Sequence, residues 1–176
     1  ITEIEPISGG FLNDTFIVTT HGNHDNYLLQ RKNKKIFKNI PGMMENIEKV
    51  TNHLKIKIIQ SGGDPKRESL TLIKTKTKDL YYQDGMGEYW TMCLLIADHE
   101  SYVEVNSPTI AYAGGKGIGK FQSMMSDFSG NLIDTLPGLH DMEFRLKQWD
   151  QVLKRDPVGR LKDVEEEISW VQQIFK

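Results

Sequence analysis

The spacing of apolar residues changes near residue 98, and this change limits the folds open to the 176-residue chain. Before residue 98, short segments rich in β-branched and aromatic residues alternate with turns that contain glycine, asparagine or aspartate, a pattern typical of an antiparallel sheet. After it, apolar residues recur every three or four positions, which indicates helices with one apolar face each. We therefore expect an α+β protein with two parts, 1–98 and 99–176.

The first part is expected to be a sheet with one helix. The predicted strands are 4–7, 16–20, 27–31, 70–73, 80–82 and 89–96. The helix is indicated by the spacing of Met44, Ile47, either Val50 or Thr51, and Leu54, after a break at Pro41-Gly42. Segment 89–96 is the most apolar strand, so we place it centrally in the sheet.

The second part is expected to contain helices alone. Three apolar stripes cover 118–128, 142–153 and 161–175. Asp156-Pro157 is a suitable start for the last helix, with aspartate as the cap and proline in the first turn. Trp149 and Trp170 fall on these stripes, so both are expected in the core.

Composition excludes several classes of protein. The longest unbroken apolar run, 92–97, is far shorter than the roughly 20 residues of a membrane span, so no membrane partner is expected. Cys93 is the single cysteine and lies in that run, where we expect an unreactive buried thiol. The chain begins without Met or an apolar signal segment, and we expect a cytoplasmic protein.

Basic residues concentrate directly after the third predicted strand. The cluster consists of Arg31, Lys32, Lys34, Lys35 and Lys38. It fits either a solvated surface or contact with the phosphate of a small molecule. A nucleic-acid partner is not expected, because no known binding motif surrounds the cluster and the net charge is −2. His21 and His24 lie in a turn without a third ligand, so no metal site is predicted there.

The order of elements is compatible with phosphate chemistry. Backbone N–H groups of a tight glycine turn at Gly9-Gly10 can approach phosphates because no Cβ blocks them. A cation at the end of a following strand can neutralise the phosphates, and a helix carboxylate can hold that cation. Glu45 and Glu48 on the predicted helix are the candidates for this carboxylate.

Ordered motifs give the chain a resemblance to a known group of enzymes. The motifs are Gly10-Phe11-Leu12-Asn13-Asp14-Thr15-Phe16, Tyr27-Leu28-Leu29-Gln30-Arg31, Phe37-Lys38-Asn39 with Met44-Glu45-Asn46-Ile47, Gly119-Lys120-Phe121-Gln122, and Pro137-Gly138-Leu139-His140-Asp141 with Arg145. Together they resemble the aminoglycoside phosphotransferase and choline kinase-like superfamily, and within it the N-acetylhexosamine 1-kinase-like proteins. Some of these proteins carry a mucin-desulfatase label, but the chain lacks the Cys/Ser-x-Pro-x-Arg sequence that a sulfatase needs.

The resemblance implies a protein kinase-like small lobe over 1–98, followed by the first helices of a large helical lobe. It also implies ATP and Mg²⁺ as cofactors and a sugar, such as an N-acetylhexosamine, as the acceptor. Its phosphate-covering loop would contain Ser8, Gly9, Gly10, Asn13, Asp14 and Thr15. Leu28 would cover the adenine, and Ile96-Ala97-Asp98 would form the hinge that meets adenine through backbone groups.

Two departures from the family pattern matter for function. Gln30 occupies the position where kinases usually place Lys or Arg, so Arg31 or a loop residue would supply the cation, held by Glu45 or Glu48. No His-x-Asp-x-x-x-x-Asn catalytic sequence occurs, so no catalytic or metal-ligating residue is assigned to this chain. We expect a truncated, inactive piece of a sugar kinase that self-associates through its helices. The alternatives are a catalytically empty nucleotide- or partner-binding α+β module and a structural domain.

Overall fold

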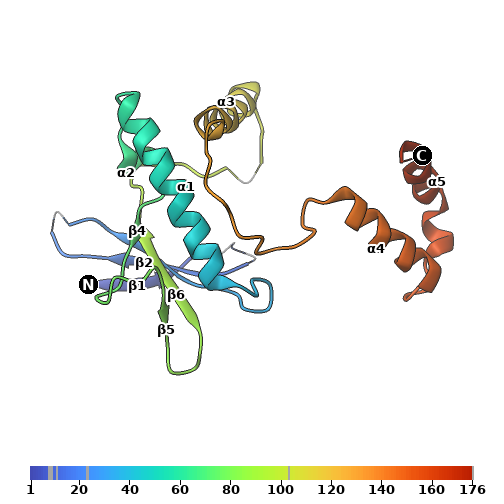
Figure 1. Ribbon diagram of the computed structural model, residues 1–176, viewed down its shortest axis with the longest axis horizontal. Coiled ribbons are helices and arrows are strands. Elements are labelled where there is room, and N and C mark those ends of the chain that lie inside the picture. Colours follow the sequence, from blue (N-terminus) through green and yellow to red (C-terminus); the bar gives the residue numbers. More distant parts are fainter. Residues whose placement is uncertain (8–9, 11, 23, 103, 176) are drawn as a thin grey trace. The chain divides into compact units, whose positions relative to one another are not determined.

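The computed structural model of the chain describes residues 1–7, 10, 12–22, 24–102 and 104–175 (Figure 1). By contacts, the chain divides into two compact units, residues 1–135 and residues 136–176. The first unit contains the sheet and three helices, and the second contains helices alone. The predicted division at residue 98 into two lobes stays a prediction.

A six-stranded antiparallel sheet forms the base of the first unit. Its strands are β1 (Glu3–Pro6), β2 (Asp14–Thr19), β3 (Tyr27–Arg31), β4 (Leu72–Ile73), β5 (Tyr82–Gln83) and β6 (Tyr89–Leu94). Their order is β1-β2-β3-β6-β4, and β5 pairs with β6. This arrangement confirms the predicted α+β class and the central place of β6, which pairs with three strands.

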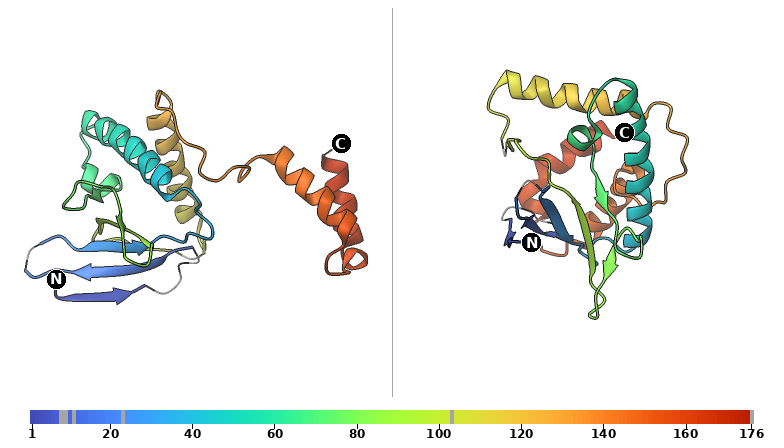
Figure 2. Two further views of the ribbon diagram at one scale, coloured as in Figure 1. Left: turned by 60° about the horizontal axis from the view of Figure 1, so that its bottom comes forward. Right: turned by 90° about the vertical axis from the view of Figure 1, so that its left-hand side faces the viewer.

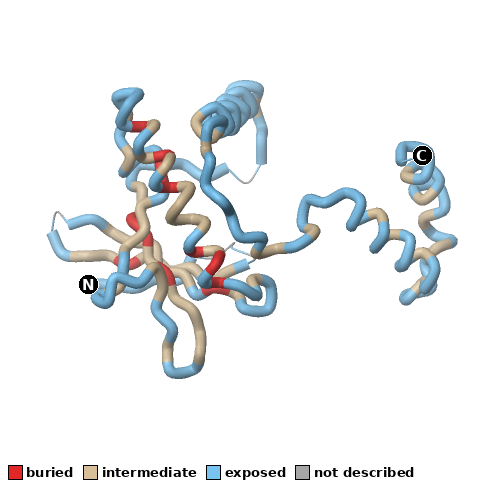
Figure 3. Tube along the Cα trace, in the orientation of Figure 1, coloured by how far each residue is buried: buried red, intermediate tan, exposed pale blue. Residues whose placement is uncertain are grey.

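The long helix α1 (Ile40–Gln60) lies on one side of the sheet (Figures 1 and 2). The Asn39 side chain caps its start by accepting a hydrogen bond from Gly42 N at 2.9 Å. Its buried residues are Ile40, Gly42, Met44, Thr51, Leu54 and Ile58. All but Gly42 recur at helical spacing, and Figure 3 shows buried positions in red along the helix. The short helix α2 (Pro65–Glu68) follows.

Helix α3 (Pro108–Met125) and the residues directly after it contact α1 through His53 and Lys57. The His53 ring lies 2.9 Å from the carbonyl of Met124 and packs edge-on against Phe128, with ring centroids 5.3 Å apart. Lys57 of α1 also pairs with Asp127. No described residue of α3 is buried.

The second unit contains α4 (Met142–Arg155), the short 3₁₀ helix η1 (Leu161–Val164) and α5 (Glu165–Ile174). The predicted helix start at Asp156-Pro157 is wrong. Asp156 instead ends α4 in the left-handed conformation, φ 39°, and its side chain accepts a hydrogen bond from Arg160 N at 2.9 Å. Trp170 is 64% exposed, so it does not belong to a core of the second unit, contrary to the prediction. No described helix of either unit is long and apolar enough to cross a membrane.

Candidate functional site

A cavity of about 380 Å³ lies where the turn before β2 meets the segment that follows β3. The described residues that line it are Gly10, Leu12, Asn13, Asp14, Arg31, Lys32, Asn33, Lys34, Lys35 and Glu88. Four of them are cations and two are carboxylates. Gly10 and most of the basic cluster, which are about twenty residues apart in sequence, therefore border one space.

Strand register brings these segments together. Asp14 is paired with Arg31 across β2 and β3, and Arg31 with Trp90 across β3 and β6. The backbone N–H of Lys32 continues the ladder by donating to Tyr89 O at 2.8 Å. Asn13 adds a link between the turn and the chain after β3, because its Oδ1 accepts from Asn33 N at 3.1 Å. The walls of the cavity are thus held by backbone hydrogen bonds between strands and by the hydrogen bond to the Asn13 side-chain amide.

The charges lining the cavity do not cancel. Asp14 holds Arg31 with oxygen and nitrogen 2.6 Å apart, and Glu88 holds Lys34 at the same distance. Lys32 and Lys35 form no ion pair with any carboxylate of the described chain. The cavity therefore carries a surplus of positive charge, which attracts an anion.

Lys32 is the most constrained of these cations. Its side chain is only 8% exposed, and its Nζ donates to Oε1 of Gln30 at 2.7 Å. Gln30 is itself oriented by Thr15, whose Oγ1 accepts from Nε2 of Gln30 at 3.1 Å. Burial lowers the pKa of the Lys32 ammonium, because the charged form loses solvent without gaining a carboxylate. A nearly buried ammonium that lacks an opposite charge is suited to an anionic ligand.

The glycine of the turn leaves room at the cavity. An added Cβ at Gly10 would meet Asn13 O at 3.5 Å, an ordinary contact. Gly10 therefore has no local steric need to be glycine, and its missing side chain widens the approach to the backbone from the cavity. Ser8 and Gly9, which were predicted to share this loop, lie outside the described residues.

The two predicted helix carboxylates bind other lysines. Glu45 pairs with Lys49 of its own helix at 2.8 Å, and Glu48 pairs with Lys74, which follows β4, at 2.7 Å. Among the described residues, neither glutamate forms an ion pair or hydrogen bond with Gln30, Arg31 or Lys32. The carboxylate that holds a strand cation is instead Asp14, a residue predicted for the phosphate loop.

The predicted hinge follows β6 and is stabilised by its neighbours. The carbonyl of Ile96 lies 2.6 Å from Nδ1 of His99, and the carbonyl of Ala97 accepts a hydrogen bond from Nη1 of Arg67. Asp98 is in the left-handed region, φ 51°, which turns the chain away from the sheet. Neither Ile96 nor Asp98 is among the described residues that line the cavity.

The structure thus brings together part of the predicted site. Gly10, Asn13, Asp14 and Arg31 line the cavity, and Thr15 and Gln30 adjoin it through Lys32. Leu28 lies two residues before Gln30, opposite Ile17 and Cys93.

Sequence reasoning placed Lys32 and Lys35 in the basic cluster without assigning either to the site. For Lys32, the available signal was its alternation with Leu28 and Gln30, which places all three on one face if the strand continues. No comparable signal marks Lys35.

No protein-family model matches the sequence. The described residues also contain no group of three or more His, Cys, Asp or Glu side chains arranged to hold a metal ion.

Proposed function

We propose that this chain supplies the nucleotide-binding part of an ATP-dependent phosphotransferase, and that the cavity beside Gly10 receives the phosphates of Mg·ATP. The observation that carries the proposal is the cavity itself, with Gly10 on one side and, on the other, Lys32 and Lys35, which have no carboxylate partner among the described residues. Phosphate binding uses backbone N–H donors together with positive charge. This cavity carries the positive charge, and in the proposal the backbone at Gly10 supplies the N–H donors.

The enzyme class in the proposal is the aminoglycoside phosphotransferase and choline kinase-like superfamily. Its support is the ordered set of motifs in the sequence, together with an antiparallel sheet that carries one long helix. The acceptor in the proposal is a sugar hydroxyl, as in the N-acetylhexosamine 1-kinase-like proteins that the motifs resemble most. The proposal gives this chain the binding of the nucleotide. It does not assign to this chain the carboxylate that activates the acceptor hydroxyl.

Lys32 takes the role that Gln30 cannot fill. A lysine ammonium has three donors, and the bond to Gln30 Oε1 uses one of them. The other two have no acceptor among the described residues and can donate to phosphate oxygens, while Gln30 and Thr15 hold the side chain in position. Arg31 is less suited, because Asp14 already neutralises its guanidinium.

Calorimetric titration of the chain with Mg·ATP and with inorganic tripolyphosphate tests the proposal. Lys32→Met should weaken the binding of both by at least about 10-fold, since a charge-assisted hydrogen bond is lost. Lys38→Met is the matched control, because Lys38 belongs to the same basic cluster but is not among the described residues lining the cavity. Gly10→Ala should also weaken binding while leaving the thermal unfolding of the chain nearly unchanged. Equal loss in the Lys32 and Lys38 variants, or no binding by the unaltered chain, would refute the phosphate site.

Turnover separates a phosphotransferase from a module that only binds nucleotide. A longer polypeptide that joins this chain to a His-x-Asp-x-x-x-x-Asn sequence should form ADP from Mg·ATP in the presence of N-acetylhexosamine, and Lys32→Met should lower this rate. The same polypeptide binding Mg·ATP with no sugar-dependent ADP would favour the catalytically empty nucleotide-binding module.

A further inference from the structure

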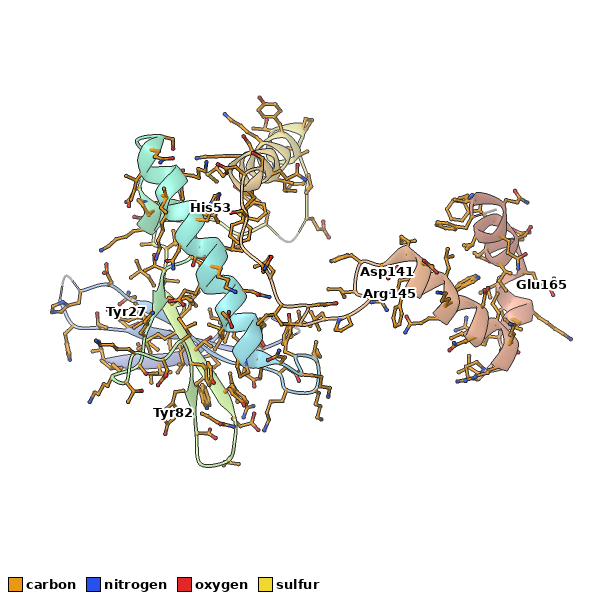
Figure 4. The ribbon with its side chains drawn as sticks, viewed as in Figure 1. Tyr27, His53, Tyr82, Asp141, Arg145 and Glu165 are labelled. Carbon is orange, nitrogen blue, oxygen red and sulfur yellow. The ribbon has the colours of Figure 1, made fainter. Side chains whose placement is uncertain are left out.

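A second cavity, of about 620 Å³, lies against the sheet and shares no described lining residue with the phosphate cavity. Its floor comes from one face of four strands, β3, β4, β5 and β6. Met92 of β6 is paired with Leu29 of β3 on one side and with Ile73 of β4 on the other. Trp90 lies two residues before Met92 on the same face and is paired with Tyr82 of β5. Figure 4 shows Tyr82 beside the hairpin of β5 and β6.

The floor is apolar and incompletely covered. Leu29, Ile73, Trp90 and Met92 are all half-buried, and Tyr82 is 59% exposed. A space of this size with aromatic and aliphatic walls is typical of a small-molecule site. Because the side chains leave the space open, apolar surface remains that a ligand can bury.

Hydrogen bonds hold the surroundings of this floor in place. The indole Nε1 of Trp90 donates to Asp84 at 2.9 Å, and the guanidinium carbon of Arg31 lies 5.9 Å from the centre of the Trp90 ring. Between β4 and β5, a closed turn joins Thr75 N to Asp79 O at 2.9 Å and Lys78 N to Thr75 O at the same distance. The cavity is therefore bounded by ordered structure on its sheet and loop sides.

The charged residues that line this cavity are lysines. Lys74 and Lys76 line the cavity, and no carboxylate is found among its described lining residues. Glu48 neutralises Lys74 at 2.7 Å. Lys76 forms no ion pair or hydrogen bond with any described residue and is exposed. One cation without an opposite charge thus stands beside an apolar floor.

We propose that this cavity binds a small aromatic anion, with its ring against Trp90 and Met92 and its anionic group at Lys76. Aromatic side chains favour a flat ring, which they contact by offset stacking or edge to face. The lone lysine favours a single carboxylate or sulfonate over a neutral molecule. The site shares no described lining residue with the phosphate cavity, although Arg31 of that cavity lies over the Trp90 ring, and the proposal does not depend on the transferase activity.

Two probes with the same ring system test this proposal. 8-Anilinonaphthalene-1-sulfonate carries one sulfonate, and N-phenyl-1-naphthylamine is its uncharged counterpart. The chain has three tryptophans, so Trp149→Phe and Trp170→Phe leave Trp90 as the sole donor of energy transfer to the probe. We expect saturable binding of the sulfonate at one molecule per chain, seen as quenching of Trp90, and weaker binding of the neutral probe.

Variants then locate the ring and the charge. Lys76→Gln should weaken binding of the sulfonate about 3- to 5-fold, the size expected for an exposed ion pair, and leave the neutral probe unchanged. Lys78→Gln is the matched control, since it removes the same charge from the same turn without lining the cavity. Tyr82→Ala should weaken both probes, and its exposed position keeps the variant folded.

Three results with the two probes would overturn the proposal. If the neutral probe bound as tightly as the sulfonate, the site would not prefer an anion. If both lysine variants bound the sulfonate alike, Lys76 would not be the residue that contacts its anionic group. Quenching of Trp90 could fail to saturate at one molecule per chain, which would place the probe on other apolar surfaces. Vesicles of phosphatidylcholine and phosphatidylglycerol should leave Trp90 emission unchanged. A blue shift of this emission would show that the region binds a membrane surface, and the small-molecule proposal would then be rejected.

Discussion

At the scale of single residues, the side chain that matters most is Lys32. Its ammonium is nearly buried and its only described hydrogen-bond acceptor is an amide oxygen, Oε1 of Gln30. Burial of a charge without an opposite charge costs stability, and such sites are commonly retained for function. Arg31 shows the contrast, because it is exposed and paired with Asp14, a contact that raises its pKa.

The lowered pKa of Lys32 predicts a dependence of stability on pH. The unfolded chain keeps this proton to a higher pH than the folded chain, so the unfolded state binds more protons between the folded pKa and the unfolded value of about 10.4. Stability from this group therefore rises as pH increases through that interval. Urea unfolding should show the free energy of unfolding of the unaltered chain rising, relative to that of Lys32→Met, from neutral pH to about pH 10.4.

Lys35→Met is the control for this measurement, since it removes an exposed lysine from the same cavity. A constant difference between the unaltered chain and Lys32→Met at all pH values would contradict the argument. A difference that grows in favour of Lys32→Met as pH rises would contradict it as well.

The sequence predicted part of the site at this scale. Glycine in the turn and the run of cations after residue 30 are visible as residue types, and register brings them to one cavity. The choice of Asp14 as the partner of Arg31, in place of Glu45 or Glu48, was not visible. It depends on which strand residues stand opposite each other, and a shift of register by one residue would reverse the faces.

At the scale of elements, the start of α1 shows most clearly how a few neighbouring residues fix where a helix begins. Asn39 caps the helix through Gly42 N, and Pro41 occupies the first turn. A Cβ added at Gly42 would have the Asn39 side chain as its three nearest neighbours, at 2.5–3.0 Å. Glycine at this position therefore serves the cap, at some cost in intrinsic helix propensity.

A double-mutant cycle tests this coupling. Asn39→Ala should lower the free energy of unfolding by about 1 kcal/mol, because the cap is lost. Gly42→Ala should lower it as well in the unaltered chain, since the new Cβ displaces the cap. In the Asn39→Ala background, the same change should raise it by about 0.5–1 kcal/mol, the usual gain of alanine over glycine in a helix. Additive effects in urea unfolding would show that Asn39 and Gly42 act independently.

Elements with a strong periodic pattern were predictable from the sequence, but the exact residues at which helices begin and end were not. Strand 27–31 and the stripe at Met44, Ile47 and Leu54 have their predicted types. The Asp-Pro pair at 156 failed because aspartate both begins helices and accepts left-handed backbone at their ends. Asn39 and Asp141 do cap the starts of their helices, because each side chain accepts a hydrogen bond from the backbone N–H three residues later.

At the scale of the whole chain, the distribution of apolar surface is uneven. The most buried hydrophobic residues belong to the sheet and α1, and no described residue of α3, α4 or α5 is buried. Exposed apolar side chains include Ile118 of α3 at 63% and Trp170 of α5 at 64%. Helical stripes were predictable from spacing, but what each stripe packs against depends on the tertiary arrangement and was not.

This exposure predicts that the chain self-associates. Contiguous apolar surface on a helix loses contact with water when a second copy covers it, and this gain drives association. Sedimentation velocity should show an average mass that rises with protein concentration, and Ile118→Lys together with Trp170→Lys should shift this rise to higher concentration. Gln122→Lys is the matched control, since it adds the same charge at an exposed polar position of α3. A chain that sediments as a monomer at every concentration, or a control that acts like the apolar substitutions, would show that these stripes do not bind each other.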